Sequence, residues 1–314
     1  MVLHTRHGQG YRLETSIRYS PFYNIHPLAQ VIYYIACLTF ALMFNNPVYV
    51  VSILVTVIIL GLMYEQPKLI IKSLKFYLIV SVFIVLINVI SIRRGRNVLF
   101  YVFEKEVTLE ALLYGIIMAI SLMSVFLIFT SFNKIITQDR FLFVFSKVSK
   151  RLAFILMMAI RWIPVLNKTA MDINMIQITK GVDYVTKNKR NLFKKLAVNL
   201  EILLGYSIEN SMITAESMKA RGYESTGKKR TFYFNYKLNN FDLLILIVEG
   251  MLIAFNIYYY MLGYGEIDIY RKLTVESFWY VYPPAYISFV ILCFIPFFIE
   301  LRGAISCMTS RLKD

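Results

Sequence analysis

Six long apolar runs constrain this fold more than any other feature of the chain. They cover residues 28–44, 47–63, 76–92, 111–130, 241–263 and 281–301. Each run has about the 17 to 20 residues that a helix needs to cross the hydrocarbon core of a bilayer. The chain is 58% hydrophobic and only 17% charged, which is more apolar than a soluble domain of this length requires. We therefore predict an all-α integral membrane protein with about six transmembrane helices.

Positive charge is concentrated between the fourth and fifth runs. Residues 131–240 contain 19 Lys and Arg against 7 Asp and Glu, so this section carries +12 of the net +15 of the chain. Such an excess is typical of segments on the cytoplasmic side of a membrane rather than of a nucleic-acid-binding surface. We predict three parts: an N-terminal tail with four spans (1–130), a cytoplasmic coupling-helix section (131–240), and a C-terminal transmembrane hairpin with its tail (241–314).

Six crossings then place both termini in the cytoplasm. The loops outside are Asn45-Asn46, 93–110 and 264–280, and the loop 64–75 lies inside. One feature opposes this topology, because the loop 93–110 begins with the three cations Arg93, Arg94 and Arg96. The charge of the middle section is much larger, and we keep the topology on that ground.

Helical periodicity runs through the charged middle section. Apolar residues recur three or four positions apart, at Leu152, Leu156, Ile160 and Ile163 and again at Leu192, Leu196, Leu200, Leu203 or Leu204, Ile208, Met212, Ala215 and Met218. This spacing predicts long amphipathic helices, which we place at 139–148, 150–180 and 192–220. The second of these contains Pro164, which predicts a bend or a start.

The two long helices end in similar sequences. Thr179-Lys180-Gly181 closes one, and Ala220-Arg221-Gly222 closes the other. A glycine just past a helix is a common stop, and a cation there favours the negative end of the helix dipole. Each end is therefore either a solvated helix terminus or a tip whose cation enters a groove on a partner and meets a carboxylate. Two such ends on consecutive helices favour docking.

Motifs for catalysis, cofactors and metals are missing. The sequence has no phosphate-binding loop, no His-Glu-x-x-His, no Gly-x-Ser-x-Gly and no Asp-rich pair for a diphosphate. His4 and His7 make weak metal ligands in the terminal tail, and Cys37, Cys293 and Cys307 show no metal spacing. The basic run Lys228-Lys229-Arg230 suits anionic lipid headgroups. We expect no catalytic, cofactor or metal site in this chain.

Several segments resemble one known family over about residues 25–240. They are Ile25-His26-Pro27-Leu28, Phe44-Asn45-Asn46-Pro47, Thr108-Leu109-Glu110-Ala111-Leu112, Ala159-Ile160-Arg161-Trp162-Ile163-Pro164-Val165-Leu166 and Ala215-Glu216-Ser217-Met218-Lys219-Ala220-Arg221-Gly222-Tyr223. The last two are the specific ones. In these segments the chain is similar to the transmembrane coupling subunit, or T component, of energy-coupling factor transporters. These transporters take up vitamins and transition-metal ions across the cell membrane of prokaryotes.

The resemblance implies partners and docking residues. In this family two Ala-Arg-Gly-type helix ends dock on two ATP-binding-cassette ATPase subunits, and the apolar stripes hold a separate substrate-binding membrane subunit, the S component. Ala220, Arg221 and Gly222 match the second motif. Thr179, Lys180 and Gly181 take the place of the first, where Thr-Lys stands instead of Ala-Arg. Lysine keeps the charge there but lacks the planar guanidinium fork.

Two other functions remain open from the residues alone. A membrane-embedded enzyme acting on lipid substrates would use the basic section as a headgroup platform, but Asp139, Asp172 and Asp183 share no motif. A scaffold that shapes the membrane through its amphipathic helices would tolerate charge reversal at the two tips. The coupling subunit predicts the opposite.

Overall fold

A computed structural model describes the helical parts of the chain. The described residues are 21–64, 67–91, 98–102, 105–181, 189–223, 236, 238–265 and 282–311. The chain divides into two compact units. Unit 1 consists of Met1–Arg140 and Tyr236–Asp314, and unit 2 is Phe141–Asn235. The chain therefore crosses between the units twice.

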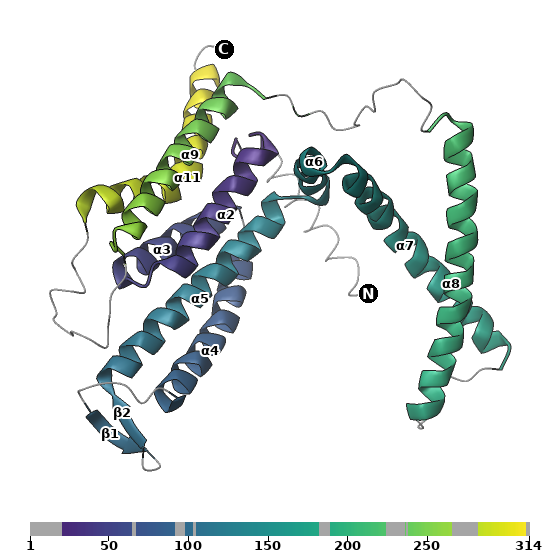
Figure 1. Cartoon of the computed structure of the whole chain (residues 1–314), viewed down its shortest axis with the longest axis horizontal. Coiled ribbons are helices and arrows are strands. Elements are labelled where there is room, and N and C mark those ends of the chain that lie inside the picture. Colours follow the sequence, from purple (N-terminus) through teal and green to yellow (C-terminus); the bar gives the residue numbers. More distant parts are fainter. Residues whose placement is uncertain are drawn as a thin grey trace. The chain divides into compact units, whose positions relative to one another are not determined.

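Unit 1 contains a helix at each of the six predicted apolar runs. These helices are α2 (Pro27–Met43), α3 (Pro47–Tyr64), α4 (Pro67–Ser91), α5 (Leu109–Ile135), α9 (Asn240–Met261) and α11 (Pro283–Arg311) (Figure 1). The prediction of helices at these runs is confirmed.

Local capping chemistry sets where the first helices begin. His26 accepts a hydrogen bond from the Leu28 N–H through Nδ1 at 3.2 Å, and Pro27 occupies the first position of α2. Asn46 repeats the pattern, since its Oδ1 accepts from the Val48 N–H at 3.0 Å. Proline suits these first positions because its missing N–H has no helical partner there. Only residues 44–46 connect α2 to α3.

One short hairpin departs from the predicted all-α fold. Strand β1 (Val98–Val102) pairs antiparallel with β2 (Lys105–Thr108), within the loop predicted to lie outside. The run Val-Leu-Phe-Tyr-Val favours a strand because branched and aromatic side chains suit a pleated surface. Thr108 then caps the next helix, as its Oγ1 accepts from the Ala111 N–H at 3.3 Å.

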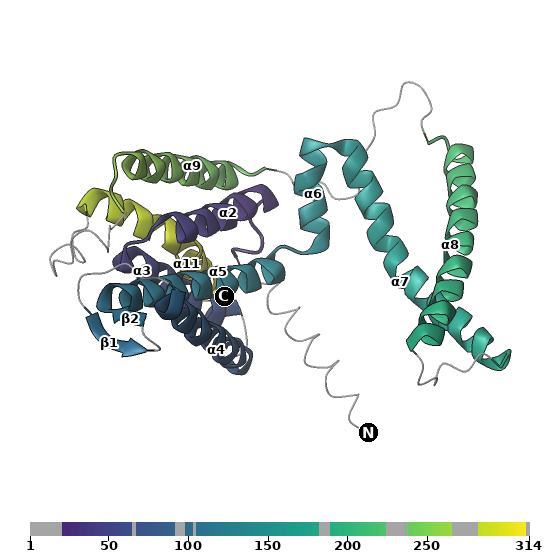
Figure 2. The ribbon, with the colours of Figure 1, turned by 60° about the horizontal axis from the view of Figure 1, so that its bottom comes forward.

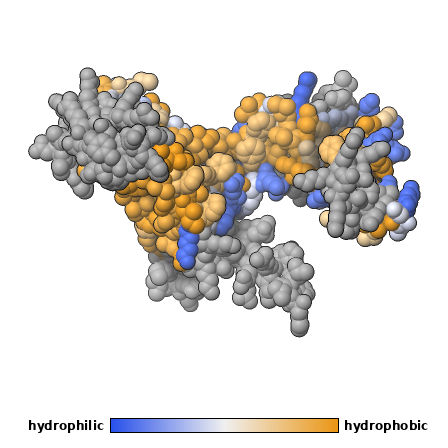
Figure 3. Space-filling model, turned by 90° about the horizontal axis from the view of Figure 1, so that it is seen from below, coloured by the Kyte–Doolittle hydropathy of each residue, from blue (hydrophilic) through white to orange (hydrophobic). Residues whose placement is uncertain are grey.

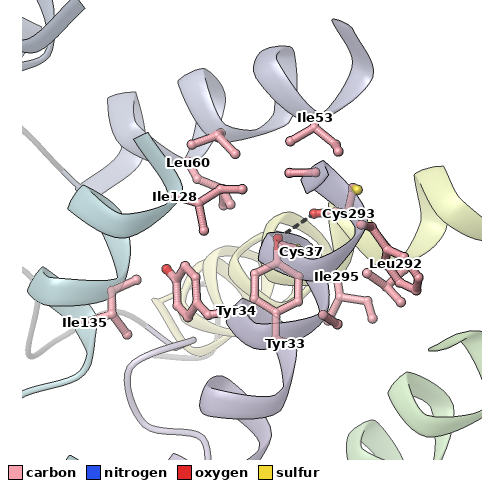
Figure 4. Packing of buried hydrophobic residues seen from close by; sticks show 14 of the residues in the cluster. Tyr33, Tyr34, Cys37, Ile53, Leu60, Ile128, Ile135, Leu292, Cys293 and Ile295 are labelled. Carbon is pink, nitrogen blue, oxygen red and sulfur yellow. Dashed lines mark hydrogen bonds between the residues drawn. The ribbon is translucent and has the colours of Figure 1, made fainter. Parts of the chain in front are cut away.

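Helix α2 lies in the core of unit 1, where it contacts α3, α5 and α9. Two tyrosines of α2 form hydrogen bonds to other helices. The Tyr33 hydroxyl donates to the Cys293 carbonyl of α11 at 2.8 Å, and the Tyr34 hydroxyl lies 2.9 Å from the Ser131 hydroxyl of α5. Figure 4 shows Tyr33 directed toward Cys293, with Ile53 of α3 and Ile128 of α5 nearby. Buried hydroxyls in an apolar core need such partners.

Unit 2 consists mainly of two long helices. After the short α6 (Gln138–Val148), helix α7 (Lys150–Thr179) and helix α8 (Lys189–Ala220) contact one another. Figures 1 and 2 both show α7 and α8 crossing. Helices at the three predicted ranges are thus confirmed, and α7 continues through Pro164.

The candidate membrane spans differ from the predicted set. By length and composition, five described helices are apolar enough to cross a membrane, in α4, α5, α7, α9 and α11. Helices α2 and α3 are apolar but shorter. Helix α7 qualifies because its charged residues are widely spaced, although its position among the basic residues led us to predict a cytoplasmic location. The count of six crossings and the cytoplasmic location of α7 stay predictions.

Candidate functional site

The end of α8 is a capped helix terminus. Arg221 follows the last helical residue, Ala220, and Gly222 has a φ of +81°. The Tyr223 N–H donates to the Met218 carbonyl at 2.9 Å, and the Gly222 N–H donates to the carbonyl three residues before it, also at 2.9 Å. Together these bonds form a Schellman motif. Glycine is required here because a Cβ makes the left-handed conformation strained.

The end of α7 repeats this arrangement. Thr179 is the last helical residue, Lys180 is the C-cap, and Gly181 has a φ of +80°. The Lys180 N–H donates to the Ile176 carbonyl at 3.1 Å, and the Thr179 Oγ1 donates to the same carbonyl at 2.7 Å. Lys180 therefore occupies at the first tip the position that Arg221 occupies at the second.

Both tip cations are exposed. Lys180 and Arg221, like the glycines that follow them, lie at the surface of unit 2. Among the described residues, neither side chain has an ion-pair partner. An exposed guanidinium keeps its five donors available to a partner. Each tip therefore presents an uncompensated positive charge.

The two tips lie at opposite ends of the helix pair rather than together. The Tyr223 ring stacks on Phe154, in the second turn of α7, with centroids 5.1 Å apart. This contact brings the end of α8 back to the beginning of α7. Lys180 is at the other end of α7, about 40 Å further along that helix at 1.5 Å per residue. The repeated endings predicted two tips. The distance between the tips follows from the way the two helices cross, which the sequence did not predict.

Both helices expose large apolar side chains. On α7 these include Leu152, Ile155, Leu156, Ile163, Met171, Met175 and Ile178, and on α8 Leu196, Leu200, Leu204, Ile208 and Met212. Figure 3 shows hydrophobic and hydrophilic residues side by side at the right of the view. Exposed apolar surface of this extent marks contact with a partner or with lipid.

Other predicted features fall elsewhere. The basic run Lys228-Lys229-Arg230 and the histidines His4 and His7 lie outside the described residues. Within the described ranges, no group of three or more His, Cys, Asp and Glu side chains is placed to hold a metal ion. Cys37 and Cys293 are buried free thiols in the core.

Sequence reasoning missed a buried polar column on α9. Asp242, Glu249 and Asn256 are spaced seven residues apart, and all three are buried. Asp242 accepts from the Asn239 N–H at 3.2 Å, and the Ser288 hydroxyl of α11 donates to Asn256 at 3.3 Å. Glu249 Oε2 has no hydrogen-bond partner among the described residues. The regular spacing within an apolar run was the available signal.

Comparison with known proteins identifies the family. Residues 20–233 match the model of the cobalt transport protein family, CbiQ. A search of curated proteins found no match. CbiQ proteins are membrane components of energy-coupling-factor-type transporters and work in complexes with ATPase subunits. A match to a transport family does not support the alternative function, a membrane-embedded enzyme acting on lipid substrates. Because the match covers more than half of the chain, this protein belongs to the CbiQ cobalt transport family.

Proposed function

We propose that this chain is the T component of an ATP-driven uptake transporter for transition-metal ions or vitamins. In this role it couples two ATP-binding-cassette ATPase subunits to a separate substrate-binding membrane subunit. The chain itself binds no nucleotide and performs no catalysis.

The observation that carries this proposal is the shared structure of the two tips. Each long helix ends in an exposed cation at the C-cap followed by a glycine in the left-handed conformation. Two equivalent tips about 40 Å apart along a helix pair suit two equivalent grooves, one on each ATPase subunit. Helix ends that were only solvated would not need the same cation and glycine at both tips.

Docking would compensate the charge of each tip. When a cation enters a groove, it loses water and must gain a carboxylate and hydrogen bonds in return. Arg221 is suited to a bidentate contact with a carboxylate, whereas Lys180 supplies a point charge. We therefore assign the stronger contact to the tip at Arg221 and the weaker one to the tip at Lys180.

The exposed apolar residues of α7 and α8 would receive the substrate-binding subunit. ATP binding and hydrolysis move the ATPases toward and away from each other, and the docked tips follow. The long helices then act as levers that change the orientation of the bound subunit. This reorientation exposes the substrate of the substrate-binding subunit to the cytoplasm.

Charge reversal at Arg221 tests the proposal. The chain is co-expressed with its ATPase subunits, and their recovery is measured after purification in mild detergent. Arg221→Glu leaves a partner carboxylate buried against a like charge, so we expect ATPase binding to weaken by about 100-fold or more. Lys219→Glu is the matched control, since it reverses an exposed charge three residues before Gly222 without changing the tip.

The outcomes separate the candidate functions. Loss of ATPase subunits with Arg221→Glu, but not with Lys219→Glu, supports the coupling role, and Lys180→Glu should cause a smaller loss. If all three variants recover the ATPase subunits as well as the parent chain does, docking through the tips is excluded and the membrane-shaping scaffold is favoured. Catalytic activity of the chain purified alone would instead support an enzyme.

A further inference from the structure

A buried carboxyl group lies near the middle of α9. Glu249 is 1% exposed, and its helix is long and apolar enough to cross a membrane. Its Oε2 atom has no hydrogen-bond partner in the described part of the chain. The other two members of the polar column have partners, since Asp242 accepts from Asn239 and Asn256 accepts from Ser288. Glu249 is therefore the member of the column whose polar group is left uncompensated.

The helices packed against α9 bring no cation to its middle. Helix α9 packs against α2 and α11, and neither α2 nor α9 contains a Lys, Arg or His. The ionisable side chains that α2 and α11 bury or half-bury are Tyr33, Tyr34, Cys37, Tyr286 and Cys293. Tyrosine and cysteine are uncharged at neutral pH. None of these groups can therefore balance a negative charge on the carboxyl group.

The charged residues of α11 belong to the other end of the helix pair. The Arg302 guanidinium carbon lies 4.0 Å from the centroid of the Phe241 ring. Phe241 comes eight residues before Glu249, which is about 12 Å along the helix. Glu300 Oε1 accepts a backbone N–H from the segment before α2 at 3.3 Å, and Arg311 is nine residues further along the chain than Arg302. These charges lie away from the middle of α9.

The histidine next to α2 is also engaged elsewhere. His26 caps the beginning of α2, and its Nδ1 accepts from the Leu28 N–H at 3.2 Å. An imidazole nitrogen that accepts a hydrogen bond carries no proton, so this ring is neutral. The opposite end of α2 meets the last turn of α9, where the Phe44 and Tyr260 rings lie 5.8 Å apart. His26 thus supplies no counter-charge to the middle of α9.

An ionised carboxylate does not suit these surroundings. Transfer of a charged group from water to an apolar site costs far more free energy than transfer of the same group in its neutral form. Ionisable residues inside membrane spans accordingly pair with one another or face water. Glu249 is buried and has no cation in the elements packed on its helix. The neutral, protonated acid is the form that this site accommodates.

A metal ion does not fit the same position. Zinc takes about four ligands, and calcium and magnesium take about six or more. Asp242 and Asn256 are each seven residues from Glu249, about 10 Å along the helix, so one ion cannot reach two members of the column. Within the described ranges, no group of three or more His, Cys, Asp and Glu side chains could hold a metal. The ligand that suits a single isolated carboxyl group is a proton.

We propose that Glu249 is a proton-binding site inside α9: it holds its proton at neutral pH, and transfer of that proton to water loosens the packing of α9 against α2 and α11. This inference does not rest on the proposed function. Both tests below use the full chain without its transport partners, so failure of the coupling role would leave their results unaffected.

Infrared spectroscopy of the full chain in lipid nanodiscs tests whether the proton is present. A protonated carboxyl group has a carbonyl stretching band that a carboxylate lacks. We expect Glu249→Gln to lose one such band from the parent spectrum at neutral pH. The matched control is Glu209→Gln, which changes an exposed glutamate of α8 and should leave this band unchanged. Identical bands in the parent and Glu249→Gln would overturn the proposal.

The pH dependence of stability tests what the proton does. The unfolded chain releases this proton above about pH 4.3, the usual value for glutamate in water. If the folded chain retains the proton, it binds one more than the unfolded chain, so stability falls as pH rises. Unfolding by sodium dodecyl sulfate is followed by circular dichroism. Relative to Glu249→Gln, the folded-to-unfolded ratio of the parent should fall by up to about tenfold per pH unit through neutral pH.

An apolar variant separates a neutral acid from a paired carboxylate. Glu249→Leu removes the polar group and leaves no charged partner behind, so it should be no less stable than the parent at neutral pH. It should also lack the parent's loss of stability with rising pH. A carboxylate held by a cation would behave in the opposite way, because leucine would leave that cation buried and unpaired. Strong destabilisation in both Glu249→Gln and Glu249→Leu, or equal pH dependence in the parent and both variants, would overturn the proposal.

Discussion

At the scale of single residues, the tips depend on backbone conformation as much as on charge. Gly181 and Gly222 both have positive φ, +80° and +81°, and these turns end the helices so that Lys180 and Arg221 project from the ends. A sequence search finds the cation-glycine pairs directly. It does not show that both cations are exposed, because exposure depends on what the rest of the chain covers.

Substitution of Gly222 tests the turn at the second tip. Gly222→Val places a branched side chain in the left-handed conformation, which costs about 1–2 kcal/mol. We expect faster hydrogen exchange at the amides of Gly222 and Tyr223 and weaker ATPase recovery, with the rest of the chain unchanged. Gly205→Ala is the control, since Gly205 is inside α8 with open space beside it and alanine favours a helix by up to about 1 kcal/mol. Equal exchange in both variants would contradict this account.

At the scale of elements, aromatic packing joins helices that are distant in sequence. Phe289 of α11 is fully buried. Its ring lies 6.2 Å from Phe40 and 5.3 Å from Phe44, at α2 and its end, and 5.0 Å from Tyr49 of α3. The apolar runs predicted each helix from its composition, but composition does not tell which face of α11 meets which face of α2. That pairing needs complementary shapes.

Truncation of Phe289 tests this packing. Phe289→Ala removes a ring that contacts two other helices, and comparable core truncations cost about 3–5 kcal/mol. We expect a clearly lower melting temperature in detergent, followed by the fluorescence of a thiol-reactive dye as the buried Cys37 and Cys293 become exposed. Phe289→Leu keeps more of the volume and should lie between the parent and Phe289→Ala. A melting temperature equal to that of the parent in Phe289→Ala would show that α11 is not packed in this way.

At the scale of the whole molecule, the charge distribution predicts a topology. Unit 2 contains most of the net positive charge of the chain, so α8 is expected in the cytoplasm, while the end of α9 is expected outside. The candidate spans by themselves leave this open, because α7 is apolar enough to be counted among them. Labelling in intact cells decides between these arrangements.

Single cysteines in a chain lacking its native three test the topology. Glu216→Cys is on an exposed position of α8 and Leu262→Cys is just beyond α9. A membrane-impermeant maleimide added to intact cells should label Leu262→Cys and not Glu216→Cys, and both should react after the membrane is opened. Labelling of Glu216→Cys in intact cells would place α8 outside and contradict the charge rule.

The sequence by itself determined the helices, most of their ends and the two tip motifs. These features are local: hydrophobic periodicity, a proline at a first position and a glycine past a last position act within a few residues of one another. The hairpin at residues 98–108 was equally local but lay in a stretch that we had assigned only as a loop.

Only the tertiary structure decided which residues meet across the chain. The crossing of α7 and α8 separates the two tips, and the stack of Tyr223 on Phe154 joins residues that are far apart in sequence. The burial of Arg140 against Tyr23 and Tyr236 is of the same kind. In a sequence, Arg140 is one cation among the 34 Lys and Arg residues. Its environment comes from segments more than 90 residues away, so no local pattern encodes it.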